Sequence, residues 1–79
     1  MKFRGTEKFE YEIVKKIAEL SHKDNTSMEL NLVSFNRAAP KYDIRVWQRK
    51  NGEEKLFRGI ALTAGEIKAL KKALVSMDI

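Results

Sequence analysis

The chain has 79 residues and a mass of 9.1 kDa, which suffices for one domain and leaves no room for a second core. It is 43% hydrophobic and 34% charged, with a net charge of +5, a composition typical of a folded globular domain. It lacks cysteine, a signal-peptide pattern and any apolar run near the roughly 20 residues of a membrane span, which argues against disulfides, secretion and membrane insertion. We therefore expect one cytoplasmic domain over residues 1–79 that gains stability by forming an oligomer.

Residues 8–20 carry the first apolar pattern of the chain. Apolar and polar side chains alternate there and change phase at residues 13–14, which predicts a strand with a β-bulge. Ile13, Ile17 and Leu20 also have helical spacing, so a helix is the alternative for this segment.

A loop, a second strand and a connection are expected next. Residues 21–27 are polar and rich in turn formers, which predicts a loop. Residues 28–35 alternate again and predict a strand, with a bulge as an option because the apolar residues change face at Val33. Pro40 disfavours helix before it and marks residues 36–40 as a connection.

Residues 41–50 show the clearest alternation of the chain and predict a third strand. Asn51-Gly52 follows and predicts a type I′ turn, whose two central residues need positive φ, and residues 55–62 return as the fourth strand. One face of the third strand carries Tyr42, Ile44 and Val46, and the other carries Lys41, Asp43, Arg45, Trp47 and Arg49.

A C-terminal helix is expected after Thr63, because Thr63 and Glu66 match a capping box. Its apolar stripe consists of Ile67, Leu70, Leu74 and Met77. This stripe can pack on its own sheet, on the helix of a second copy or on both, and we assign it to a homodimer interface. The predicted fold class is α+β, with a four-stranded antiparallel sheet followed by one helix (ββββα).

The sequence offers no arrangement suited to catalysis. Ser21, His22 and Asp24 contain the atoms of a catalytic triad, but they lie too close together in one loop to converge. His22 is the only imidazole, and no ligand spacing indicates a metal site. We expect no enzyme activity, no metal and no cofactor.

The basic excess lies in the middle third, where residues 31–60 hold seven basic and three acidic side chains. Arg45 and Arg49 flank Trp47 on one face of the third strand. Bases stack on such an indole while cations hold the phosphates, so we expect Trp47 to be exposed and to bind single-stranded nucleic acid. The alternative is that Trp47 packs in the core or in a dimer interface.

The register of the hairpin adds a second argument. It brings three pairs of side chains face to face: Arg49 with Glu54, Trp47 with Leu56, and Arg45 with Arg58. Opposed guanidinium groups repel each other, so we expect an anion such as phosphate to bridge the last pair. Phe35, next to Asn36 and Arg37, is a second candidate stacking platform, with a core position as its alternative.

Several segments resemble the single-strand-binding domain of the transcriptional coactivator positive cofactor 4 family. They are residues 41–47 (Lys-Tyr-Asp-Ile-Arg-Val-Trp), 51–54 (Asn-Gly-Glu-Glu) and 57–63 (Phe-Arg-Gly-Ile-Ala-Leu-Thr). Residues 29–36 and 39–45 are similar to its bacterial YdbC-like branch. The resemblance extends from Glu29 to about Leu74, and its most specific pieces are Asp43-Ile-Arg45, Trp47 and Arg58-Gly-Ile60.

The resemblance implies a non-catalytic homodimer whose β-ribbons line a channel for single-stranded DNA. At the matching positions it implies base stacking by Phe35 and Trp47 and backbone contacts by Arg45 and Arg58. Strand geometry adds the cations Lys41, Arg49 and Lys55, and Asn36 and Arg37 are included as neighbours of Phe35. The full set of candidate nucleic-acid-binding residues is Phe35, Asn36, Arg37, Lys41, Arg45, Trp47, Arg49, Lys55 and Arg58.

The leading hypothesis is a sequence-tolerant single-stranded DNA-binding protein that acts in transcription or in DNA replication and repair, with weaker affinity for duplex DNA. One alternative is a dimerising interaction module that contacts a protein of the transcription machinery and binds DNA weakly. Another is an RNA-binding chaperone, because stacking on aromatic rings serves RNA equally well.

Overall fold

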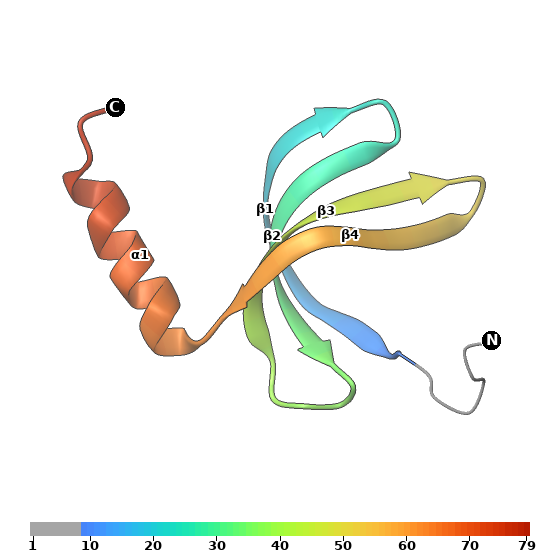
Figure 1. Ribbon diagram of the computed structural model, residues 1–79, viewed down its shortest axis with the longest axis horizontal. Coiled ribbons are helices and arrows are strands. Elements are labelled where there is room, and N and C mark those ends of the chain that lie inside the picture. Colours follow the sequence, from blue (N-terminus) through green and yellow to red (C-terminus); the bar gives the residue numbers. More distant parts are fainter. Residues whose placement is uncertain (1–8) are drawn as a thin grey trace.

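The computed structural model describes residues 9–79 as one antiparallel sheet followed by one helix (Figure 1). The elements are β1 (Tyr11–Lys23), β2 (Thr26–Phe35), β3 (Lys41–Lys50), β4 (Glu53–Leu62) and α1 (Ala64–Ser76). The strands lie in the sheet in sequence order, so each strand forms a hairpin with the next. The predicted ββββα order is confirmed, and the helix alternative for the first segment is wrong. Residue 8, the expected start of the first strand, lies outside the described residues.

Strand β1 contains three bulges rather than the single bulge predicted. Its pairing with β2 shifts at Val14, Ile17 and Leu20, each of which is an extra residue opposite a regular β2. These side chains are 48%, 43% and 54% exposed. Repeated bulges bend and twist a strand and make an edge a poor template for pairing with another chain. The three-residue spacing of the bulges explains why the segment also has helix-like periodicity.

In two of the three hairpins, the strands extend closer to the turn than the sequence predicts. The expected loop over residues 21–27 is a turn at Asp24 and Asn25, because the polar residues on either side of it continue the β1–β2 ladder. The Asn51-Gly52 turn is confirmed, with φ angles of 54° and 78°. Strand β4 starts at Glu53, two residues earlier than expected.

The curved sheet has an inner face and an outer face. The inner face carries alternate residues of β2 and β3, namely Ser27, Glu29, Asn31, Val33, Asp43, Arg45, Trp47 and Arg49. Within residues 9–79, the buried hydrophobic residues are Val33 and Trp47, so the core lies on this face. The outer face carries Leu30 and Ile44 and is only partly covered.

Helix α1 begins at the predicted capping box. The Thr63 hydroxyl accepts a hydrogen bond from the Glu66 amide at 3.1 Å, and the Glu66 carboxylate accepts one from the Thr63 amide at 2.8 Å. The helix stands beside the sheet (Figure 1), and none of residues 64–76 is buried. Met77, the predicted last member of the apolar stripe, lies after the helix in extended conformation, so its place in a helical stripe is wrong.

Candidate nucleic-acid interface

Trp47 lies in the core and is 0% exposed, so the expectation of an exposed indole is wrong and its alternative, a core position, is correct. The ring of Tyr11 meets the indole edge-on, with 5.6 Å between centroids, and the Arg49 guanidinium lies 5.1 Å from the indole centroid. Strand β1 curves over the inner face and covers this position. Because of this cover, a base cannot stack directly on Trp47 in this conformation.

The register of the β3–β4 hairpin corrects a second expectation. The pairs Arg49–Glu54 and Trp47–Leu56 are confirmed, but a bulge between Arg45 and Trp47 places Arg45 opposite Gly59. Arg58 is therefore not the partner of Arg45, and the predicted pair of opposed guanidinium groups is absent from residues 9–79. The register shift moves every β4 residue beyond the bulge by one position.

The anion beside Arg45 comes from the chain itself. Asp43, which is fully buried, accepts hydrogen bonds from Arg45 Nη2 at 2.8 Å and from Arg45 Nε at 2.9 Å. Arg45 Nη1 donates to the Phe57 carbonyl at 2.9 Å, and the guanidinium lies 5.3 Å from the Phe35 ring centroid. An external phosphate is therefore not required to hold Arg45.

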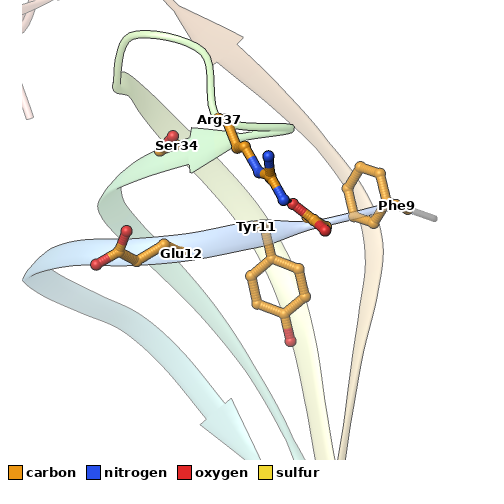
Figure 2. A pocket seen from close by; sticks show the side chains of 6 residues that line it. Phe9, Tyr11, Glu12, Ser34 and Arg37 are labelled. Atoms are coloured by element: carbon orange, nitrogen blue, oxygen red, sulfur yellow. Dashed lines mark hydrogen bonds and ion pairs between the residues drawn. The ribbon is translucent and has the colours of Figure 1, made fainter.

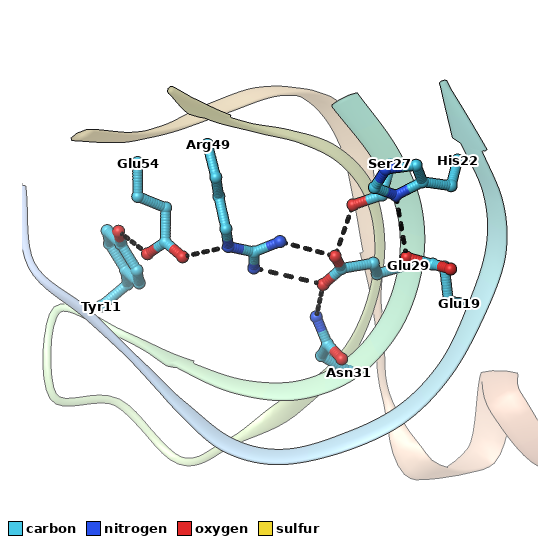
Figure 3. Close-up of polar contacts among 8 residues, drawn as sticks. All are labelled: Tyr11, Glu19, His22, Ser27, Glu29, Asn31, Arg49 and Glu54. Atoms are coloured by element: carbon cyan, nitrogen blue, oxygen red, sulfur yellow. Dashed lines mark hydrogen bonds and ion pairs between the residues drawn. The ribbon is translucent and has the colours of Figure 1, made fainter. Parts of the chain in front are cut away.

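Arg49 is held by two carboxylates on the inner face (Figure 3). It donates to Glu29 at 2.7 and 3.3 Å and to Glu54 at 2.7 Å. The hydrogen bond from Arg49, followed by those from Ser27 and Asn31, lowers the pKa of Glu29 to about 2, although burial acts in the opposite direction.

The phenol of Tyr11 completes this network by donating to Glu54 (Figure 3). Burial and this hydrogen bond raise the pKa of Tyr11 to about 12. The same hydrogen bond, followed by that from Arg49, lowers the pKa of Glu54. The network thus joins β2, β3 and β4 through ionised groups and β1 through the neutral phenol of Tyr11.

The centre of the inner face is not basic, in contrast to the charge of the segment that forms most of it. Three carboxylates, from Glu29, Asp43 and Glu54, oppose the two guanidinium groups of Arg45 and Arg49. The other predicted cations, Arg37, Lys41, Lys55 and Arg58, are all exposed and lie farther out. Lys55 pairs with Gln48 and thus lies on the face opposite Arg49.

An aromatic cluster occupies the open end of the inner face, where β1 begins and β2 ends. Phe9 lies 6.0 Å from Tyr11 and 5.9 Å from Phe35, measured between ring centroids, and Tyr11 continues the cluster to Trp47. Phe9 is 61% exposed. Sequence reasoning listed Phe35 and Trp47 and missed Phe9 and Tyr11, because only the pairing of Tyr11 with Phe35 joins them.

Asn36 and Arg37 anchor this end of the sheet. Both have positive φ, at 52° and 66°, and Asn36 exchanges hydrogen bonds of 2.7 and 3.0 Å with Glu10. Arg37 Nε donates to the Glu10 carboxylate at 3.0 Å while its side chain stays 84% exposed. Figure 2 shows that Arg37 and Tyr11 project to opposite sides of β1. An open pocket of about 510 Å³ lies between Phe9 and Arg37.

Other features of the described part of the chain concern its single histidine, metal-binding clusters and membrane-spanning helices. His22 lies 3.2 Å from Glu19 (Figure 3). Residues 9–79 contain no group of three or more His, Asp or Glu side chains placed to hold a metal ion. They also contain no helix with the length and apolarity that crossing a membrane requires.

Two comparisons with known proteins identify relatives of this chain. The model of the family described as Transcriptional Coactivator p15 (PC4) matches residues 23–73, a range that includes every candidate binding residue named from the sequence. A Treponema pallidum (strain Nichols) protein described as uncharacterized is 39% identical over 72 residues, which cover 90% of this chain and 82% of that protein.

Proposed function

This chain belongs to the PC4 transcriptional coactivator p15 family, and from that membership and the geometry we propose that it binds single-stranded DNA with little sequence preference. The family is non-catalytic and binds single strands. The aromatic cluster at the open end of the inner face, next to exposed cations, is the observation that assigns the proposed binding to particular residues. Bases stack on aromatic faces whatever their identity, whereas cations hold the sugar-phosphate backbone.

In the proposed complex, Phe9 and Phe35 provide the stacking surface. Phe35 lies beside the Arg45 guanidinium, and Phe9 is the most accessible ring of the cluster. Trp47 supports this surface from beneath through Tyr11. Phosphates contact the rim, where the candidate cations are Arg37, Lys41 and Arg58, and reach Arg45 and Arg49 at their exposed edges. Lys55 lies on the opposite face and is not part of this proposal.

We propose that the protein acts as a homodimer. A groove of about 470 Å³ between the outer face and α1 is lined by Leu20, Leu30, Ile44, Ile67, Leu70, Lys71, Leu74 and Val75. Leu74 and Val75 are 50% and 79% exposed, and burial of such apolar surface contributes roughly 25 cal/mol per Å². A second copy presents the same apolar groove and can cover this one with twofold symmetry.

Sedimentation velocity tests the dimer. The wild type should sediment as a dimer at micromolar concentration, and Leu70→Glu should sediment as a monomer because it places a charge in the groove. Lys68→Glu, a change on the same helix at a residue outside the groove, is the control. A monomeric wild type would refute the dimer and leave the groove available for the alternative, a protein of the transcription machinery.

Fluorescence anisotropy of a labelled oligothymidine tests the binding site. Phe35→Leu keeps an apolar contact and removes the ring face, so it should weaken binding roughly 5- to 150-fold, the range expected for one stacked base. Arg37→Ala should reduce the salt slope by about 0.7 through loss of one phosphate contact, whereas the control Lys72→Ala on α1 should not. Absence of binding by the wild type at low salt would refute the proposal.

The same titration compares the possible nucleic acids. Oligouridine tests the RNA alternative, and a duplex of the same length tests the expected preference for single strands. Tighter binding of oligouridine than of oligothymidine would favour an RNA-binding role.

A further inference from the structure

The two carboxylates that hold Arg49 differ in how firmly they are fixed. The side chain of Glu29 is 9% exposed, and it also accepts hydrogen bonds from Ser27 at 2.5 Å and from Asn31 at 3.0 Å. The side chain of Glu54 is 32% exposed and, within residues 9–79, has two hydrogen-bond partners, Arg49 and Tyr11. Glu29 is therefore a structural anchor, whereas Glu54 can leave at low cost.

Removal of Glu29 from Arg49 would leave buried polar groups without partners, which is costly. Glu54 lies close to the Asn51-Gly52 turn, where its carboxylate can turn toward water. Exposed ion pairs of this kind contribute little net free energy. Arg49 is itself 35% exposed, so a ligand can reach the Nε edge that Glu54 occupies.

A phosphate oxygen and a carboxylate oxygen make the same charge-assisted hydrogen bond to a guanidinium group. With both carboxylates in place, Arg49 carries one positive charge against two negative charges, which disfavours a phosphate. Glu54 and a DNA phosphate thus compete for one edge of Arg49.

From this geometry we infer that Glu54 is a built-in competitor for the nucleic-acid backbone at Arg49 and sets the affinity of the inner face for single strands. The inference rests on the proposed function. In it, Glu54 leaves Arg49 when a phosphate binds, and Tyr11 retains the displaced carboxylate. The residue thereby weakens binding to isolated phosphates and favours strands that also stack on the aromatic cluster.

The variant Glu54→Gln tests this inference, with Glu53→Gln as a matched control. Both changes raise the net charge by one, but Glu53 pairs with Lys50 in the ladder and makes no ion pair within residues 9–79. Glu54→Gln should bind oligothymidine roughly two- to fivefold more tightly than Glu53→Gln, the range of an exposed ion pair. Its salt slope should equal that of Glu53→Gln, because Arg49 contacts one phosphate in both complexes and only the cost of displacing the carboxylate differs.

The side-chain Nε–H resonance of Arg49 provides a second measurement. It should shift when oligothymidine is added to the wild type, and it should do so at lower oligonucleotide concentration in Glu54→Gln. If the wild type binds DNA while this resonance stays in place, or if the two glutamine variants bind equally, the inference is wrong. If the wild type does not bind DNA, the proposed function fails instead, so the two failures are distinguishable.

Discussion

Gly59 is the position where a single methyl group should disturb the sheet most. A Cβ atom at this residue would lie 2.5 Å from the Cβ of Arg45, 2.6 Å from the carbonyl oxygen of Ile44 and 2.7 Å from the Cα of Arg45. Ordinary contacts begin near 3.4 Å, and two of these three atoms are backbone. Strands β3 and β4 must therefore separate locally to accept an alanine.

We expect Gly59→Ala to destabilise the fold by about 1–3 kcal/mol, the range of overpacking in a closely packed site. For a chain of this size, that loss lowers the midpoint of thermal unfolding by roughly 4–24 °C. Far-UV circular dichroism at one fixed protein concentration measures the shift, because a dimer would unfold at a concentration-dependent temperature.

Two other glycines provide matched controls. Gly65, in the first turn of α1, has only Thr63 Oγ1 near its virtual Cβ, at 4.0 Å, so Gly65→Ala should leave stability unchanged or raise it by up to about 1 kcal/mol. Gly52 has open space but a φ of 78°, so Gly52→Ala should cost about 1 kcal/mol through backbone strain. If Gly59→Ala unfolds at the wild-type temperature, the close contact with Arg45 is not present in solution.

Three further predictions concern stability and ionisation. The pKa of Glu29, about 2, lies below its ordinary value of 4.5, so its stabilising effect is complete above pH 4.5 and is lost as pH falls toward 2. Urea unfolding across that range should show a smaller loss of stability in Glu29→Gln than in the wild type, because Glu54, whose pKa is also lowered, still contributes. The phenol of Tyr11 should ionise near pH 12 in an ultraviolet titration. Because its ordinary pKa is 10, the stability of the fold should decrease as pH rises from 10 toward 12. Tyr11→Phe should remove both this ionisation step and this loss of stability. Thr63→Ala should cost about 1 kcal/mol in urea unfolding through loss of the helix cap, and an unchanged midpoint would contradict this role.

Local sequence signals predicted the elements that depend on neighbouring residues. The Asn51-Gly52 turn needs positive φ at two positions, and the cap at Thr63 needs one hydroxyl and one carboxylate, so both are readable from a few residues. The bulges of β1 are not readable in this way. Val14, Ile17 and Leu20 become extra residues only relative to a regular β2, which is a property of the pair.

Because a bulge is a property of a strand pair, the sequence of one strand did not reveal it, and this explains the errors at the site. A bulge between Arg45 and Trp47 changed the partner of Arg45 from Arg58 to Gly59, and alternation within β3 alone carries no sign of it. Exposure of Trp47 was inferred from its cationic neighbours. Those neighbours are instead paired with carboxylates of the inner face, and curvature from the β1 bulges closes β1 over the indole.

The charge of residues 31–60 and the charge of the inner face differ because alternation divides side chains between two faces and because Glu29 of the inner face lies outside that segment. Residues 31–60 have four more basic than acidic side chains, yet the centre of the inner face has three carboxylates against two guanidinium groups. A phosphate backbone that crosses this centre gains little, so the free energy of binding must come from the cationic rim and from stacking. In the proposed complex, stacking on Phe9 and Phe35 is indifferent to base identity, and rim contacts recognise only phosphate. An interface of this composition therefore favours flexible single strands, whose bases can turn toward the rings, over a duplex whose bases are already stacked.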